Sequence, residues 1–327
     1  MNVAINGLGR IGKEFLIAVI ESKKNYNLFV NDPSPIDSLV YSLTHDSVHP
    51  SLKNVKTKNR ALIIGKKTIP VTHEMDPEKL PWKKNKIDVV VECTGHFTDK
   101  SGASKHLIAG AKKVLISAPG KNTDATIVYG INNSKIKNKK IISAGSCTTN
   151  CLVPPLNIIN DKLGIKAAHF VTTHAYTSTQ NLIDGHNAKS FVRGRAAAGN
   201  IVPSSSGASI SVVKALPELK GKIDGYALRV PVVDGSFATI VAKVKKKTTS
   251  DELNKIFKKY SKGKLKGILG YEKELLVSTD IINNPHSSII DSNFTTVQGD
   301  LVSVGCWYDN EHGYSHRLLD ILSLMKD

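Results

Sequence analysis

Cysteine is scarce in this chain, and so are aromatic residues and long apolar runs. Only four cysteines occur in 327 residues, and no two of them have CxxC spacing, which argues against a disulfide framework and against a metal site. No apolar run approaches the roughly 18 residues of a membrane span. Met1 leads directly into the apolar segment 2–6, so we expect no signal peptide. Together these absences favour a cytoplasmic globular protein.

Acidic residues are also outnumbered, with 28 Asp and Glu against 45 Lys and Arg, which gives a net charge of +17. The lysines are spread over short clusters at 53–58, 83–86, 135–140, 243–247 and 258–266. Aromatic residues make up only 6% of the chain, whereas surfaces that bind single-stranded nucleic acid interleave basic and aromatic side chains. We therefore expect a solvated basic surface that attracts phosphorylated metabolites, and keep nucleic-acid or polyanion binding as an alternative.

The length is typical of about two domains, and the first begins with a glycine-rich motif. A short apolar strand at 2–6 leads into Gly7-x-Gly9-x-x-Gly12, and an amphipathic run at 15–20 follows. In a dinucleotide-binding fold, the first glycine permits the turn and the second allows the backbone to approach a pyrophosphate. The third allows helix and strand to pack closely. The context therefore predicts a dinucleotide site.

The next predicted strand, 28–31, ends in Asp32, twenty residues after Gly12. A carboxylate there binds a ribose 2′-hydroxyl and repels a 2′-phosphate, which favours NAD over NADP. Strands at 87–95, 113–117 and 126–129, with a helix at about 100–110, predict a doubly wound parallel sheet. Ligands bind at the carboxyl ends of such strands. The residues that we expect at this edge are Asp32, Thr94, Gly95, Ser117, Ser146 and Cys147.

Cys147 lies between an apolar run at 140–142 and a helical pattern at 152–163, so it occupies a strand-to-helix turn. Backbone N–H groups at a helix start stabilise negative charge, and we therefore expect the thiol to lose its proton more easily than usual. The alternative is a small buried apolar residue. Hydroxyls at Ser146, Thr148 and Thr149 favour a functional thiol.

The second half of the chain has longer, alternating strands at 169–176, 225–233, 237–244 and 301–308, which predict a mainly antiparallel sheet in an α+β domain. The segment 177–206 has weak periodicity, as functional or interfacial loops do. His174 lies on the first of these strands. A reactive thiol needs a base, but a hydrogen-bonded core histidine is equally compatible with this position. We expect the other histidines to be exposed.

Several motifs carry a resemblance that covers nearly the whole chain. They are 6–12, 31–33, 92–95, 116–119, 146–151, 173–177, 216–222, 228–231 and 307–315. In this order they resemble the phosphorylating glyceraldehyde-3-phosphate dehydrogenase family. The related erythrose-4-phosphate dehydrogenases are the alternative within enzymes, although Asn31 and Asp32 favour the first family.

The resemblance implies a Rossmann NAD-binding domain at 1–147, a catalytic α+β domain at 148–311 and a C-terminal helix, 312–327, that packs back on the first domain. It implies glycolytic oxidation of glyceraldehyde 3-phosphate with NAD and inorganic phosphate to 1,3-bisphosphoglycerate. His174 would take the proton of Cys147, and the reaction would pass through a hemithioacetal and a thioester. The family also implies a homotetramer, with 177–206 packed across subunits.

The resemblance further assigns ligand-binding residues. Those for NAD are Gly7, Gly9, Arg10, Ile11, Gly12, Asp32, Thr94, Gly95, Phe97, Ser117 and Asn310. Those for the substrate phosphate are Thr177, Arg229 and Arg193, although Arg195 fits the same loop. Those for the attacking phosphate are Ser146, Thr148, Ser206 and Gly207.

The chain departs from the family pattern at a few positions. Ser206 replaces the usual Thr and keeps its hydroxyl. Met75 stands where a basic or polar residue is common near the adenine. Gly185-His186 replaces Gly-Pro near a neighbouring subunit's ribose, which leaves the strictness of the NAD preference open. Cys151, Cys93 and Cys306 are expected to be buried and without a catalytic role.

Overall fold

The computed structural model describes residues 1–22, 24–188 and 190–326. These form two compact units, one comprising residues 1–145 together with the chain from Ser315 onward and the other Ser146–Tyr314. We describe each unit by itself. None of the helices in the described ranges combines the length and the apolar character needed to cross a membrane.

The N-terminal unit is built on a nine-stranded sheet in the order β3-β4-β5-β2-β1-β6-β7-β9-β8. All neighbours from β5 to β8 run parallel, while β3, β4 and β5 pair antiparallel. The strands are β1 (Asn2–Asn6), β2 (Asn27–Asn31), β3 (Val55–Lys58), β4 (Ala61–Ile64), β5 (Lys67–Thr72), β6 (Val89–Glu92), β7 (Lys113–Ile116), β8 (Ala125–Thr126) and β9 (Ile141–Ser143). The predicted dinucleotide-binding α/β architecture is confirmed.

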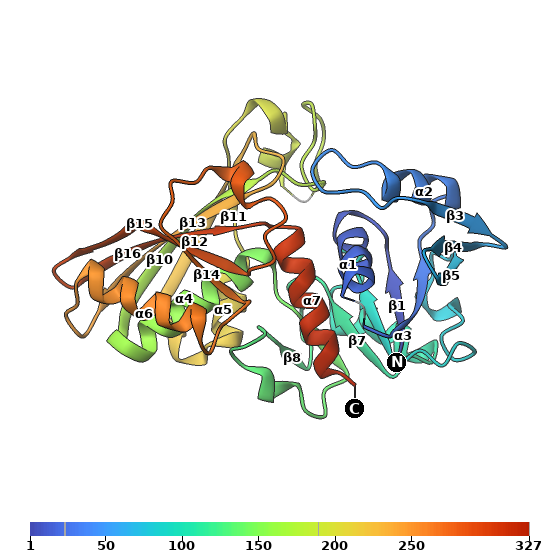
Figure 1. The fold of residues 1–327 in the computed structure, drawn as a ribbon, viewed down its shortest axis with the longest axis horizontal. Coiled ribbons are helices and arrows are strands. Elements are labelled where there is room, and N and C mark those ends of the chain that lie inside the picture. The colour runs from blue at the N-terminus through green and yellow to red at the C-terminus, as the bar shows by residue number, and fades with distance from the viewer. Residues whose placement is uncertain (23, 189, 327) are drawn as a thin grey trace. The chain divides into compact units, whose positions relative to one another are not determined.

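Helices α1 (Arg10–Glu21), α2 (Ile36–Thr44) and α3 (Lys100–Ile108) connect these strands, with short 3₁₀ turns at Pro77–Lys79 and Asn133–Ile136 (Figure 1). Burial explains the apolar runs: every residue of β6 is buried, as expected for a central parallel strand. Helix α7 (His312–Leu324) returns to this unit, where Ser323 Oγ accepts a hydrogen bond from Lys24 Nζ at 2.7 Å.

Two predicted strands are shorter than expected. The strand predicted over 87–95 spans only Val89–Glu92, because the chain turns at Gly95 with a φ of +73°. The strand predicted over 126–129 ends at Thr126. Beyond it the Asn132 side chain accepts from Val128 N at 2.8 Å and donates to Thr126 O at 2.9 Å, so it takes the place of a neighbouring strand. Sequence periodicity also missed α2 and the β3–β4 hairpin.

The C-terminal unit contains a seven-stranded sheet in the order β11-β12-β10-β13-β16-β15-β14. The strands are β10 (Ile165–Ala175), β11 (Val202–Ser205), β12 (Ile223–Val230), β13 (Ser236–Val244), β14 (Leu269–Glu272), β15 (Ser288–Gln298) and β16 (Leu301–Tyr308). Helices α4 (Cys147–Leu163), α5 (Ala208–Ala215) and α6 (Ser250–Lys262) lie on the same side of this sheet in Figure 1. Short 3₁₀ turns complete the unit at Phe191–Gly194, Ala197–Gly199, Pro217–Leu219 and Ser278–Ile281.

Most neighbours in this second sheet are antiparallel, which confirms the predicted α+β class. Two pairs run parallel, however: β10 with β12 and β14 with β15. Alternation of apolar and polar residues indicates that one face of a strand is buried, but it does not indicate whether neighbouring strands run parallel or antiparallel. The parallel β10–β12 pair is possible because the chain from 176 to 222, which includes β11 and α5, provides the crossover that parallel strands need.

Candidate functional site

At Gly7 and Gly12 the glycine turn of the N-terminal unit packs too closely for a side chain. Gly7 has a φ of +90°, and a Cβ on Gly12 would lie 1.9 Å from the Gly7 carbonyl oxygen. Gly9, by contrast, precedes the first turn of α1 and has no atom within 4 Å of its Cβ position. Gly7 and Gly12 therefore allow β1 and α1 to approach each other, while the open side of Gly9 leaves room for a ligand.

A cavity of about 400 Å³ lies beside this turn. The residues that line it are Asn6, Gly7, Gly9, Asn31, Asp32, Pro33, Ser34, Glu74, Met75, Cys93, Thr94, His96 and Phe97. The Asp32 carboxylate is fixed by two backbone donors, Leu8 N at 2.7 Å and Ser34 N at 2.9 Å. A carboxylate held at the end of β2 beside a glycine-rich turn fits the ribose of a dinucleotide. Cys93 was predicted to be a core residue, but it lines this cavity and is only partly buried, because β6 ends before it.

A buried hydrogen-bonded chain forms part of the structure under this cavity. Glu92 Oε2 accepts from Asn6 Nδ2 at 2.6 Å and from His106 Nε2 at 3.0 Å, and Glu92 Oε1 accepts from Thr94 N at 2.7 Å. Trp82 Nε1 donates to His106 Nδ1 at 3.1 Å. Because an indole nitrogen can only donate, His106 carries its proton on Nε2 and donates it to Glu92.

The same chain continues to the other side of the cavity. Asn31 Nδ2 donates to Asn6 Oδ1 at 2.7 Å, and Asn31 Oδ1 accepts from Glu74 N at 3.0 Å. Side chains from β2, β1 and β6 thus hold both the Glu74 loop and the Thr94 loop. We call the residues Asn31, Asn6, Glu92, His106 and Trp82 the polar floor.

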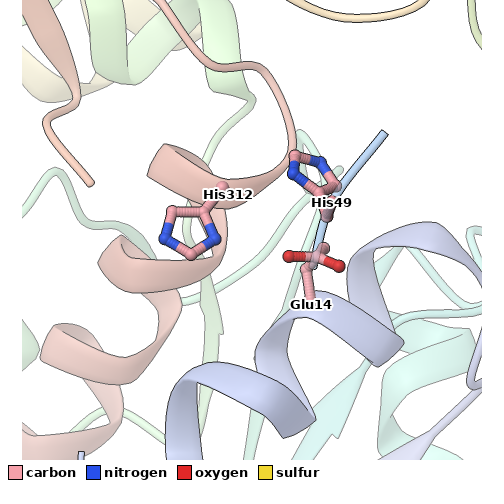
Figure 2. Close-up of side chains that lie close together, drawn as sticks. All are labelled: Glu14, His49 and His312. Atoms are coloured by element: carbon pink, nitrogen blue, oxygen red, sulfur yellow. The ribbon is translucent and has the colours of Figure 1, made fainter. Parts of the chain in front are cut away.

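Two histidines contradict the expectation that all but His174 are exposed. His106 is fully buried in the polar floor, and His49 is buried in the loop after α2. Figure 2 shows His49 beside Glu14, which projects from α1; a His49 ring nitrogen lies within 4.8 Å of a Glu14 carboxylate oxygen. Sequence context failed here because polar neighbours along the chain do not exclude burial by distant segments.

Arg10 lies at the start of α1 and forms an ion pair with Asp46, which also binds Lys13. Burial would raise the pKa of Asp46. Hydrogen bonds from Lys13, from the backbone N–H groups of His49 and Val48, and from Arg10 outweigh that effect and hold the pKa well below its usual value. Asp46 therefore orients Arg10 beside the glycine turn, a contact that no motif indicated.

The remaining residues predicted for the cofactor in this unit lie close to the polar floor or the glycine turn. Ser117 Oγ donates to Glu92 O at 2.9 Å, and the Phe97 ring meets His106 edge-on with centroids 6.2 Å apart. Gly95 forms the turn after β6 with positive φ. Ile11 is partly buried in the first turn of α1.

In the C-terminal unit, Cys147 is the first residue of α4. Ser146 caps this helix, since its Oγ accepts from Thr149 N at 3.0 Å. Cys147 Sγ lies 3.4 Å from His174 Nε2, near the end of β10. The fold therefore brings together a thiol and an imidazole that are 27 residues apart in the sequence.

The protonation of this pair follows from its surroundings. His174 Nδ1 lies 2.7 Å from the Ala175 carbonyl oxygen, an acceptor, and 2.8 Å from Arg229 Nη1, a donor, while Nε2 faces the thiol. Burial lowers the pKa of His174 to about 3, and the charge of Arg229 adds to this effect. Near neutral pH the imidazole is therefore a neutral base.

The thiol of Cys147 differs from the expectation of a lowered pKa. Burial raises its pKa, and the nearby Arg229 charge and a Thr148 hydrogen bond offset this only in part. In this structure, burial away from water therefore has a larger effect on the pKa of Cys147 than its position at the helix start. Cys147 is consequently a protonated thiol near neutral pH, with the His174 imidazole within its reach.

Arg229 lies directly beside His174 on the neighbouring strand β12. Its Nη1 donates to the Ala175 carbonyl at 3.0 Å and lies 2.8 Å from His174 Nδ1. Its Nε is buried and has no hydrogen-bond partner among the described residues. A buried guanidinium with an unused donor indicates a place for an anion.

Thr177 and Arg193, also predicted for phosphate, lie on the segment after β10. Thr177 Oγ1 is 2.9 Å from Thr179 Oγ1, which in turn accepts from Arg193 Nη1 at 3.5 Å. The charge of Arg193 lowers the pKa of His174, which places this side chain near the thiol–imidazole pair. Arg195 instead pairs with Asp184 at 3.0 Å, which favours Arg193 as the residue that faces the site.

The four residues predicted for a second phosphate lie at two helix starts. Ser146 and Thr148 belong to the start of α4, where Thr148 Oγ1 is 3.1 Å from Tyr308 OH. Ser206 and Gly207 precede α5, where Ser206 Oγ accepts from Ala208 N at 3.2 Å. Helix starts with hydroxyl side chains are suited to anions.

Sequence reasoning missed several side chains around this pair. Tyr308 OH lies 2.7 Å from Thr172 Oγ1, and the Tyr308 ring meets His174 edge-on with centroids 5.8 Å apart. Ser236 Oγ donates to Asn310 Oδ1 at 2.6 Å. Ser236 could have been noticed in the sequence because it is a polar residue at the start of an apolar strand. Cys151 and Cys306 are fully buried, as predicted.

Comparisons with known proteins agree along the chain. Residues 1–100 match the family described as "Glyceraldehyde 3-phosphate dehydrogenase, NAD binding domain", and residues 146–310 match "Glyceraldehyde 3-phosphate dehydrogenase, C-terminal domain". The chain is 46% identical to glyceraldehyde-3-phosphate dehydrogenase 2 of Nostoc, covering all of this chain and 99% of that protein. It is 46% identical to glyceraldehyde-3-phosphate dehydrogenase 1 of Bacillus subtilis and 44% identical to the Geobacillus stearothermophilus protein of that name, each over 98% of this chain and 97% of the relative.

Proposed function

Because the chain belongs to the glyceraldehyde 3-phosphate dehydrogenase family, we propose that it oxidises glyceraldehyde 3-phosphate with NAD and inorganic phosphate to 1,3-bisphosphoglycerate. One observation carries this proposal: Cys147 Sγ faces Nε2 of His174 at 3.4 Å. A nucleophile beside a positioned base is the arrangement that covalent catalysis at an aldehyde requires.

Residues 1–147 would hold NAD, with the helix at 312–327 packed back on them, and residues 148–311 would carry the chemistry. The residues of the N-terminal unit fit the cofactor, because the space beside Gly9 is open and Asp32 is fixed at the adjoining cavity. When bound, NAD supplies the hydride acceptor. The side chains of this unit bind and orient it, with Asp32 at the ribose.

The thiol performs the covalent steps. Cys147 passes its proton to His174 Nε2 as Sγ bonds to the aldehyde carbon, and His174 returns that proton to the carbonyl oxygen to give a hemithioacetal. His174 then accepts the hydroxyl proton while the carbon loses hydride, which leaves a thioester. Phosphate attacks the thioester, the Cys147 thiolate leaves, and His174 restores its proton. A positioned general base contributes roughly 10²–10⁴-fold to such a step.

Two groups of residues would hold the phosphates. Arg229, with its unused buried donor, together with Thr177 and Arg193 would bind the phosphate of the substrate. Ser146, Thr148, Ser206 and Gly207, at the starts of α4 and α5, would bind the attacking phosphate. The attacking anion would be drawn to N–H groups that already point out of the helices.

We also propose a homotetramer located in the cytoplasm. The segment 177–206 exposes large apolar side chains, among them Leu182, Ile183, Phe191 and Ile201. Such a patch is typical of a surface that a partner subunit covers. The four cysteines are all free thiols, which suits a reducing compartment.

A single assay tests the catalytic proposal. The purified chain is mixed with NAD, phosphate and glyceraldehyde 3-phosphate, and NADH is followed by absorbance; a parallel reaction contains erythrose 4-phosphate instead. We expect NADH formation mainly with glyceraldehyde 3-phosphate, and none without phosphate beyond a single turnover. Faster turnover of erythrose 4-phosphate would assign the related activity. Failure with both, in a folded protein, would leave binding of polyanions as the role of this chain.

A further inference from the structure

Ser236 is the first residue of β13, the strand that lies between β10 and β16. It pairs across the sheet with Tyr308, the last residue of β16, and Asn310 follows two residues later. On its other side β10 ends at Ala175, directly after His174. Ser236 therefore sits at the end of three adjoining strands, between the segment that carries the base and the segment that carries Asn310.

The hydroxyl of Ser236 bridges these two segments. Its Oγ accepts from Ala175 N at 3.1 Å and donates to Asn310 Oδ1 at 2.6 Å. Ser236 is fully buried and Asn310 is nearly so, which means that neither group exchanges these partners for bulk water. The backbone N–H of Ala175 can only donate, so it occupies one acceptor position of the hydroxyl and leaves the hydroxyl proton for Asn310.

This arrangement fixes which way the Asn310 amide faces. If the amide were rotated by half a turn, its NH₂ group would face Ser236 and the buried hydroxyl proton would lose its acceptor. In the observed orientation Oδ1 is occupied by Ser236. The NH₂ group makes no hydrogen bond to any described residue, so it remains as a donor for a ligand.

We propose that Ser236 is a positioning residue that orients the Asn310 amide to present its NH₂ group to the carbonyl oxygen of the nicotinamide carboxamide. This inference rests on the proposed function and on the family resemblance, which implies that Asn310 holds the nicotinamide amide of NAD. Without Ser236 the amide can present either oxygen or nitrogen, so the cofactor's carboxamide is no longer held in one orientation. Ser236 would act on the cofactor through Asn310, to which its hydroxyl donates.

The test measures NAD binding by calorimetric titration, which does not depend on turnover. We compare the wild type, Ser236→Ala, Asn310→Ala and the double variant, each with NAD and with thionicotinamide adenine dinucleotide, whose sulfur is a poorer acceptor than oxygen. We expect Ser236→Ala to weaken NAD binding by about 2- to 12-fold, the range for one neutral hydrogen bond, and to reduce the preference for NAD over the thio analogue. In the Asn310→Ala background, Ser236→Ala should change neither quantity by more than about 2-fold.

Ser288→Ala is the matched control, because Ser288 is also a fully buried strand serine of the C-terminal unit. It should lower stability without changing the preference between the two cofactors. If Ser236→Ala does not fold, Ser236→Cys replaces the hydroxyl by a weaker donor of similar shape and should show the same loss of preference. Two outcomes would overturn the proposal. In one, the fold-losses of NAD affinity in Ser236→Ala and Asn310→Ala multiply in the double variant, which would mean that the two residues act independently. In the other, Ser288→Ala loses as much of the preference for NAD over the thio analogue as Ser236→Ala does.

The catalytic assay separates this inference from the proposed function. A wild-type chain that binds NAD but does not oxidise glyceraldehyde 3-phosphate would contradict the proposed reaction and leave the binding comparison valid. An active wild type with unchanged binding in Ser236→Ala would contradict the role of Ser236 alone.

Discussion

Asp32→Asn should weaken the discrimination between NAD and NADP. Both oxygens of the Asp32 carboxylate are fixed by backbone N–H groups, and the residue is only 9% exposed, so the charge cannot move away from an added 2′-phosphate. At about 4 Å, two like charges repel by roughly 1 kcal/mol in water and by roughly 4 kcal/mol at a surface-like effective dielectric. These energies correspond to a preference for NAD of about 5-fold to about 10³-fold.

The substitution removes the charge and one of the two hydrogen bonds. The NH₂ group of Asn can only donate, so it cannot accept from the backbone N–H group that it faces. The lost hydrogen bond affects both cofactors, whereas the charge affects only NADP. The ratio of kcat/KM for NAD to that for NADP, measured at one fixed ionic strength, therefore isolates the charge. We expect this ratio to fall by at least about 5-fold, the lower limit of the repulsion.

Asp37→Asn is the matched control, because Asp37 is an exposed carboxylate on α2 of the same unit. It changes the net charge equally and should leave the ratio within about 2-fold of the wild type, since exposed charges are strongly screened. An unchanged ratio in Asp32→Asn, or an equal change in Asp37→Asn, would show that the cofactor preference arises elsewhere.

Further predictions concern the thiol, the imidazole and the assembly. Cys147→Ser should abolish NADH formation while Cys151→Ser keeps most of it; alkylation of active enzyme at Cys151 in place of Cys147 would refute this. The pKa of His174 is lowered to about 3 from 6.5, so the unfolded chain binds the extra proton first, and stability should fall as the pH drops from about 6.5 towards 3. Urea unfolding of His174→Asn should show less of this loss; an identical pH dependence would contradict the assigned burial. Light scattering should give about four times the 35.4 kDa chain mass, and a monomer with full NAD affinity would disprove the assembly.

The N-terminal unit could be predicted from the sequence to a large extent, because its signals are local. Glycine spacing, a buried apolar strand and Asp32 at a strand end each depend on neighbours along the chain. The polar floor could not be predicted, since His106 and Trp82 become its members only when α3 and the loop that carries Trp82 fold against β6. Sequence periodicity also cannot predict that a side chain forms the hydrogen bonds of a neighbouring strand, as Asn132 does beside Val128.

In the C-terminal unit, too, contacts between segments that are distant in the sequence could not be predicted. The position of Cys147 at the start of α4 followed from local pattern, but its distance to His174 depends on how α4 packs on β10. The raised pKa of Cys147 also depends on this packing, because burial is a property of the folded chain. The resemblance to a known family supplied the pairing of these residues, while the role of Ser236 came only from the structure.

The polar floor also has a consequence for how the cofactor cavity behaves before any ligand arrives. Loops normally lose conformational freedom when they close on a ligand, and this loss weakens binding. Here the Thr94 loop is held by Glu92 and the Glu74 loop by Asn31, and Asn6 joins the two. The cavity is therefore preorganised during folding, and the amide protons of Thr94 and Glu74 should exchange with deuterium slowly for loop positions, with or without NAD.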